Sequence, residues 1–145
     1  MNDIIYVMFR NSWDFQEAYY RCRIPLKCEN SPYGKVLYIA AMSNIAFSCE
    51  MYLKTLYYIE NKKCKKGHKL NELFNSLSEE LKLYIIEKMN YDKLDFQAKL
   101  ISHSNAFEKW RYYHEWTQTS ETINFSFLED FANSLFRICN EKIEK

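Results

Sequence analysis

The longest regular pattern of apolar and polar positions runs through residues 35–61. Apolar side chains recur there at spacings of three and four residues, which places them on one face of an α-helix. The members of this stripe are Tyr38, Ala41, Met42, Ile45, Cys49, Tyr52, Leu53 and Leu56. Further apolar residues flank the stripe and leave only a narrow polar side, so the sequence predicts a long helix at the centre of the fold.

Capping residues and prolines divide the rest of the chain into further helices. Ser, Asn and Asp favour helix starts because their side chains bind free backbone N–H groups, and a Glu three residues later completes a capping box. Such starts occur at Asn11 and Ser12, at Ser76 with Glu79, at Asp92 or Asp95, and at Ser126 with Glu129. The predicted helices cover residues 13–23, 70–77, 78–89, 92 or 95 to 116, and 126 onward, with loops between Pro25 and Pro32 and over 117–124. The sum is an all-α, up-and-down bundle of four main helices plus a short helix.

The composition agrees with few connections and an aromatic core. The chain has 145 residues, enough for a single domain, 1–145, with its own core. Only 2 Gly and 2 Pro occur, which disfavours turn-rich β-sandwiches and barrels. The 12 Tyr and 10 Phe residues predict a core built from rings, whose hydroxyl groups need hydrogen-bond partners. So many rings also predict an exposed apolar face that a second copy of the chain covers in a symmetric homodimer.

Charge and cysteine content narrow the class of protein. The formal net charge is +1, whereas proteins that coat nucleic acid need clustered Lys and Arg. The 5 Cys residues are irregularly spaced and form no CxxC pair, which argues against a disulfide framework or a zinc ribbon. The first residues lack the basic region of a signal peptide, and no apolar run has the length of a transmembrane helix. We therefore expect a cytoplasmic protein with reduced thiols and no membrane contact.

The densest polar cluster within an aromatic stretch is Trp110-Arg111-Tyr112-Tyr113-His114-Glu115. In a helix, Arg111 and Glu115 are four residues apart and can form an ion pair. A guanidinium binds phosphate bidentately and an imidazole moves protons near neutral pH, so Arg111 and His114 are candidate catalytic residues. The alternative is structural: Glu115 or Glu108 holds Arg111, and His114 stabilises the C-terminal end of the helix.

Two other polar positions lie on the predicted helices. Glu50 lies on the narrow polar side of the central helix, where it is either an exposed charge paired with Lys54 at i+4 or a buried carboxylate that orients Arg111. His103 lies on an apolar stripe, where a histidine is more often a hydrogen-bonded core residue than a catalyst.

The segment 61–69 is the most basic part of the chain. Cys64 and His68 have the spacing of half a zinc site, but no second pair follows and the flanking lysines repel a cation. A run of lysines is usually a solvated surface, so we predict that the segment is a solvent-exposed loop. The alternative is that its lysines contact a phosphate group.

Three segments in this order carry a family resemblance. They are residues 44–54 with a Cys-Glu pair, residues 67–77 with a Gly-His loop before a Leu-Phe helix, and residues 105–115 with an aromatic-Arg-Tyr helix. Together they resemble the bacterial HEPN domains (higher eukaryotes and prokaryotes nucleotide-binding). The resemblance implies a helical bundle, in agreement with the helix pattern described above.

The resemblance also implies two kinds of function. Many HEPN proteins are metal-independent RNases of toxin–antitoxin, abortive-infection or CRISPR-linked defence systems, in which an Arg and a later His act in the cleft of a dimer. Arg111 corresponds to that Arg, and His114 follows it at a shorter spacing than is usual in the family. In an RNase, Arg111 would stabilise a phosphorane and His114 would transfer the 2′-hydroxyl proton.

Other HEPN proteins lack the Arg and His pair and serve as binding or dimerisation modules, including companions of small nucleotidyltransferases. In a protein of this kind, Arg111 and Glu115 together with Glu50 and Tyr112 would hold a nucleotide, and an exposed aromatic face would bind a protein partner. The resemblance implies no metal or other cofactor in either case. A structural adaptor without any ligand is the third alternative.

Overall fold

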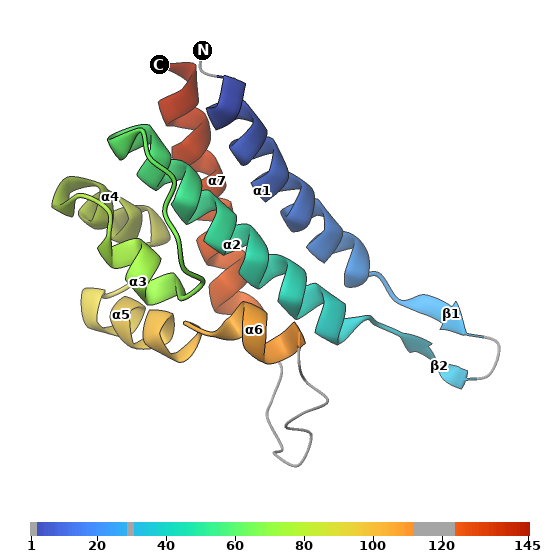
Figure 1. Ribbon diagram of the computed structural model, residues 1–145. Helices are drawn as coiled ribbons and strands as arrows, with labels where there is room; N and C mark the ends of the chain where they lie inside the picture. The colour runs from blue at the N-terminus through green and yellow to red at the C-terminus, as the bar shows by residue number, and fades with distance from the viewer. Residues whose placement is uncertain (1–2, 29–30, 112–123) are drawn as a thin grey trace.

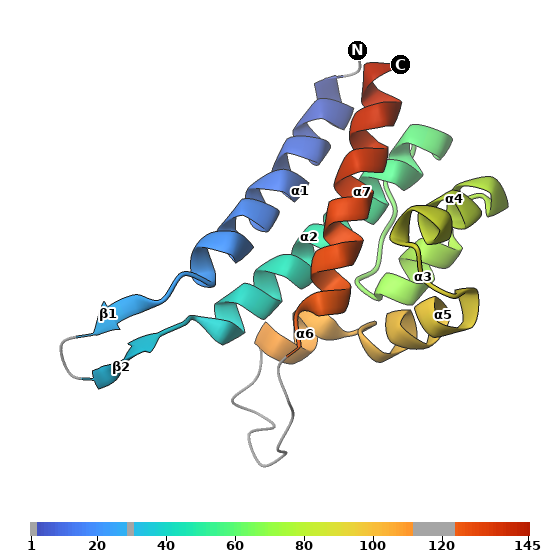
Figure 2. The ribbon, with the colours of Figure 1, turned by 180° about the vertical axis from the view of Figure 1, so that it is seen from behind.

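Three long helices form the body of the protein. The computed structural model describes residues 3–28, 31–111 and 124–145. The long helices are α1 (Asp3–Cys22), α2 (Tyr38–Asn61) and α7 (Ser126–Glu144). Helix α1 runs antiparallel to α2, whereas α7 runs parallel to α2 and packs against both (Figure 1; Figure 2).

Four shorter helices lie between α2 and α7 in the sequence. They are α3 (Leu70–Asn75), α4 (Glu79–Met89), α5 (Lys93–Ser102) and α6 (Ala106–Arg111), and they gather on one side of α2 and α7 (Figure 1). The all-α bundle predicted from the sequence is confirmed. The described residues, however, form three long and four shorter helices rather than four main helices and one short one. Because the short helices return the chain to the end where α2 begins, α7 can run parallel to α2.

A small β-hairpin replaces the loop predicted between the two prolines. Strands β1 (Leu26–Cys28) and β2 (Ser31–Lys35) pair antiparallel and extend beyond the ends of α1 and α2 (Figure 1). Pro32 lies in β2. Proline lacks an N–H donor, but a strand with only one neighbour leaves half of its N–H groups facing solvent, so Pro32 is tolerated there.

Several predicted helix starts are wrong. Helix α1 begins at Asp3, and Ser12 is buried within it and donates a hydrogen bond to the Met8 carbonyl oxygen at 2.8 Å. The start of α4 is capped by Ser78, whose Oγ accepts from the Leu81 N–H at 3.2 Å, instead of by a Ser76–Glu79 box. Short polar side chains also bond to carbonyl groups inside helices, so their presence alone does not mark a start.

The long helix predicted up to residue 116 is interrupted. Asp92 caps its start as predicted, accepting from the N–H groups of Leu94 and Asp95, but α5 ends at Ser102 and α6 begins at Ala106. The turn between them is fixed by a tertiary contact, since the Ser104 carbonyl oxygen accepts from the Leu70 N–H at 3.1 Å. This contact determines the direction in which α6 leaves the turn.

The core agrees well with the predicted apolar stripe of α2. Every member of the stripe is buried except Tyr38, which is 48% exposed near the hairpin. Many tyrosine hydroxyl groups have side-chain partners on other helices, as the composition predicts. These pairs are Tyr19 with Glu129, Tyr20 with Asn133, Tyr52 with Gln16, Tyr84 with Glu141 and Tyr91 with Asp130. Among the described residues, no helix is both long enough and apolar enough to cross a membrane.

Candidate functional site

A buried carboxylate lies in the middle of α2. The side chain of Glu50 is fully buried, although the simpler prediction made it an exposed charge. Its Oε1 lies 3.5 Å from Nζ of Lys54, which confirms the predicted i+4 pair, and 2.6 Å from Nδ1 of His68. Removing a carboxylate from water is unfavourable unless a positive or hydrogen-bonding partner compensates, and these two residues supply that partner.

His68 reaches Glu50 from the basic loop, residues 62–69. Helix α2 is capped at its C-terminal end by Lys62, which adopts a left-handed conformation (φ 56°), and Gly67 has φ 109°, a value that favours glycine. The loop then returns from the end of α2 toward the start of α3 (Figure 1). The His68 side chain is still 57% exposed. One edge of the imidazole, at Nδ1, therefore contacts a buried carboxylate, while more than half of the side chain stays exposed to solvent.

The second carboxylate oxygen of Glu50 is unusual. Oε2 is buried and has no hydrogen-bond partner among the residues that the structure describes. Buried polar atoms are nearly always paired, so an unpaired one indicates strain, a functional role or a bound water molecule. Since Oε1 already binds two groups, Glu50 has more hydrogen-bonding capacity than the packing around it uses.

Helix α6 begins beside the segment that carries His68. The Leu70 N–H, two residues after His68, donates to Ser104 just before α6, and Ser104 Oγ donates to Asn71 Oδ1. Helix α6 also packs on α2, where the rings of Phe107 and Phe47 stack with centroids 4.6 Å apart. Phe47 precedes Glu50 by less than one helical turn. The three segments that carry the family resemblance therefore meet around the middle of α2.

The other predicted site residues lie at or beyond the end of α6. Arg111 is the last residue of that helix, and its side chain lies outside what the structure describes. Tyr112, His114 and Glu115 also lie outside the described residues. The predicted alternative in which a buried Glu50 contacts Arg111 stays a prediction, whereas the described partners of Glu50 are Lys54 and His68.

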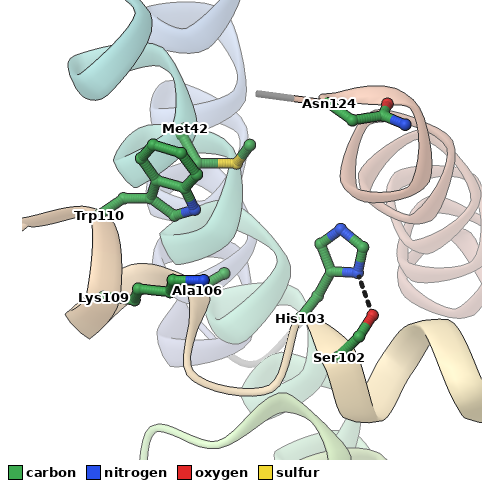
Figure 3. A pocket seen from close by; sticks show the side chains of 7 residues that line it. All are labelled: Met42, Ser102, His103, Ala106, Lys109, Trp110 and Asn124. Carbon is green, nitrogen blue, oxygen red and sulfur yellow. Dashed lines mark hydrogen bonds between the residues drawn. The ribbon is translucent and has the colours of Figure 1, made fainter. Parts of the chain in front are cut away.

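His103 lies beside a small cavity where α5 ends and α6 begins. The cavity, of about 130 Å³, is lined by Met42, Ser102, His103, Ala106, Lys109, Trp110 and Asn124 (Figure 3). Nδ1 of His103 lies 2.7 Å from the Lys99 carbonyl oxygen, and the ring packs against Phe127. Burial lowers the pKa of His103 below its ordinary value. These contacts agree with the predicted role of a hydrogen-bonded residue at the edge of the core.

From the sequence, His68 has the spacing of half a zinc site and is expected in a basic loop and in the Gly-His segment of the family resemblance, but not in contact with Glu50. Cys64 is exposed and unbridged, and no group of three or more His, Cys, Asp or Glu side chains within the described ranges is placed to hold a metal ion. The signal for the observed contact was present in the sequence, because Glu50 interrupts a nearly apolar stretch of α2. Nothing in the sequence identified its partner, which is 18 residues away.

The chain was also compared with known proteins. No protein-family model, curated protein or solved structure matches it. Function is therefore inferred from the fold and from the geometry around Glu50.

Proposed function

We propose that this chain is a HEPN-like protein of toxin–antitoxin or phage-defence type that acts on RNA in the cytoplasm. In this proposal it is a homodimer that cleaves RNA without a metal ion, through Arg111 and His114. The observation that carries the proposal is the contact between the buried carboxylate of Glu50 and His68. A buried ionisable group with a specific partner is a candidate functional residue. The pair joins two of the three segments that resemble the HEPN family, and the Leu70–Ser104 hydrogen bond and the Phe47–Phe107 ring contact connect the third.

The proposed chemistry requires a guanidinium and an imidazole near one phosphodiester. Arg111 would bind two phosphate oxygens and stabilise the charge that develops in the transition state. His114 would transfer a proton to or from the reacting oxygens. A transphosphorylation of this kind leaves a 2′,3′-cyclic phosphate and a 5′-hydroxyl group.

The dimer is supported by the aromatic content of the chain, which has 12 Tyr and 10 Phe residues. Four large apolar side chains of α1 are 40–53% exposed, namely Ile4, Tyr6, Val7 and Trp13. At 100° per residue, Ile4 and Val7 lie on the opposite side of the helix from Tyr6 and Trp13, so these residues do not form a single patch. Light scattering should report a dimer, and a monomer at high micromolar concentration would contradict this part of the proposal.

Oε2 of the buried Glu50 side chain, which has no hydrogen-bond partner within the described ranges, supports an alternative function. In that case the chain is a non-catalytic HEPN module that binds a nucleotide or a protein partner such as a nucleotidyltransferase, through Arg111 and Glu115 together with Glu50 and Tyr112. This alternative predicts no RNA cleavage by the wild-type protein. It also predicts that Arg111→Ala abolishes nucleotide or partner binding without unfolding the protein.

Cleavage of a single-stranded RNA separates the two functions. We expect cleavage in the presence of EDTA, with Arg111→Ala and His114→Ala each reducing the rate strongly. The double variant should be little worse than either single variant, because groups that act as one unit are non-additive. Arg137→Ala, which removes an exposed arginine from α7, is the matched control. Cleavage that is insensitive to both Arg111→Ala and His114→Ala would exclude the proposed site.

A further inference from the structure

We propose that His68 is a catalytic residue for RNA cleavage, with Glu50 as its positioning residue. The proposal rests on the RNase function above and makes His68, instead of His114, the group that accepts the 2′-hydroxyl proton. It is carried by the 2.6 Å contact between Nδ1 of His68 and Oε1 of Glu50 and by the opposite exposures of the two side chains.

The contact fixes which nitrogen of His68 can accept a proton. A carboxylate oxygen only accepts hydrogen bonds, so Nδ1 of His68 must carry hydrogen and donate to Glu50. In the neutral ring Nε2 is then the acceptor. No hydrogen-bond partner of Nε2 occurs within the described part of the chain, and the ring is 57% exposed. The free nitrogen is therefore available to a substrate.

Glu50 is suited to support a positive charge on His68. A buried carboxylate that accepts from Nδ1 holds the imidazole in one orientation and stabilises the imidazolium that forms when Nε2 takes up a proton. The carboxylate itself is held by Lys54, whose side chain is only 16% exposed. A histidine that served only to satisfy the charge of Glu50 would not need to remain open to solvent, because Lys54 already supplies a positive partner.

The surroundings of His68 suit a polyanion. The loop that carries it includes Lys62, Lys63, Lys65, Lys66 and Lys69, and these positive charges favour the approach of a nucleic-acid backbone. The side chain of His68 is 57% exposed and lies on the surface instead of in an enclosed cavity. An open site of this kind admits a chain that enters and leaves at both ends, as RNA does.

The proposed step moves one proton and exchanges one P–O bond. Nε2 of His68 takes the proton of a ribose 2′-hydroxyl, and the 2′-oxygen forms a bond to the adjacent phosphorus. The bond from phosphorus to the 5′-oxygen breaks, and that oxygen takes a proton from water. The hydroxide left behind receives the proton held by His68, so the products are a 2′,3′-cyclic phosphate and a 5′-hydroxyl end, with the imidazole restored.

His68→Asn is the decisive variant, because the Asn amide N–H can still donate to Glu50 whereas no basic nitrogen remains. We expect circular dichroism and the melting temperature to stay close to those of the wild type. General acid–base groups contribute roughly 10²–10⁴-fold to rate, so kcat on a single-stranded RNA should fall by about that factor while KM changes little. His103→Gln, which replaces a histidine outside this site, should retain wild-type cleavage.

Glu50→Gln tests the positioning role. A glutamine amide can offer either an oxygen or an N–H group to Nδ1, so ¹⁵N NMR should show that His68 no longer occupies only the Nδ1–H tautomer. We expect kcat to fall with KM nearly unchanged, a split that simple destabilisation would not produce. A tautomer and kcat that both match the wild type would overturn this role.

Three results distinguish failure of this proposal from failure of the proposed function. Wild-type protein that cleaves no RNA overturns both. Wild-type cleavage that survives His68→Asn overturns only the role of His68, as does an equal loss of activity in His103→Gln. If His68→Asn does not fold, His68→Gln, which offers its amide near the position of Nε2, provides the same measurement.

Discussion

One carboxylate at the start of α7 binds two residues at the end of α1 and just after it, and its removal should lower stability measurably. Oε2 of Glu129 accepts from Tyr19 Oη at 2.5 Å and lies 2.9 Å from Nη1 of Arg23. Tyr19 is fully buried, whereas the Arg23 side chain is 44% exposed. The perturbation is Glu129→Ala, which removes both interactions.

The expected loss in the free energy of unfolding follows from the different burial of Tyr19 and Arg23, the two partners of Glu129. A hydrogen bond to a charged group contributes about 1.5–3 kcal/mol, whereas an exposed ion pair contributes about 0–1 kcal/mol. Tyr19 Oη still accepts from Arg23 Nη1, but its buried O–H donor is left without a partner. We therefore expect Glu129→Ala to lower the free energy of unfolding by roughly 2–3 kcal/mol, most of it from Tyr19.

Urea unfolding followed by circular dichroism provides the assay, and a double-mutant cycle isolates the bond. Tyr19→Phe should be destabilising in the wild-type background but nearly neutral in Glu129→Ala, because it then removes a hydroxyl that is already unpaired. Glu144→Ala, near the end of α7 and exposed, is the control and should change stability by less than about 0.5 kcal/mol. Strict additivity of Glu129→Ala and Tyr19→Phe would refute the reasoning.

Three further predictions concern ionisable and capping groups. Burial raises the pKa of Tyr19 and Tyr52, and burial with a bond to a carboxylate raises the pKa of Tyr91 to about 12. The folded state therefore favours the neutral phenols. Their contribution to the free energy of unfolding should be complete below the ordinary tyrosine pKa of about 10 and should decrease as pH rises above it. Phenolate absorbance that rises in one step at the ordinary pKa, without unfolding, would contradict this. Burial lowers the pKa of His103. Its contribution to the free energy of unfolding should therefore be complete above the ordinary histidine pKa of about 6.5 and should decrease as pH falls below it. The melting temperature of His103→Gln should depend less on acid pH than that of the wild type. Asp92→Ala removes the cap of α5 and should cost about 1 kcal/mol in urea unfolding, whereas Asp92→Asn should be nearly neutral.

Features that depend on local periodicity could be predicted from the sequence. The stripe of α2 repeats over many turns, so its buried face was identified almost completely. The last helix was also predicted, but its Ser126–Glu129 capping box is wrong, because Phe125 is the N-cap residue without a side-chain bond and Glu129 binds Tyr19 and Arg23. The cap at Asp92 was predicted because its signal acts within a few residues. The hairpin was missed because its strands are short and contain Pro32 and Gly34, which are uncommon in strands.

Features decided by contacts between distant residues could not be predicted in this way. The interruption after α5 contains neither Gly nor Pro and depends on the bonds of Ser104 to Leu70 and Asn71. The burial of Glu50 likewise depends on His68, which the loop after α2 brings back to the middle of that helix. In both cases the partner is far away in the sequence, and nothing near Ser104 or Glu50 identifies it.

The arrangement of the three long helices also has a consequence for the order of folding. Helices α1 and α2 are joined by a short hairpin, so their mutual contacts close a small loop, whereas α7 must close a loop that contains all four short helices. The buried bond from Tyr52 Oη to Gln16 Oε1 lies entirely within the α1–α2 pair, and α7 then supplies Asn133 to the Gln16 amide. We expect the first two helices to pair early, while the chain is still being synthesised, with one apolar face still uncovered. The docking of α7 onto that face would then limit the rate at which the native state forms.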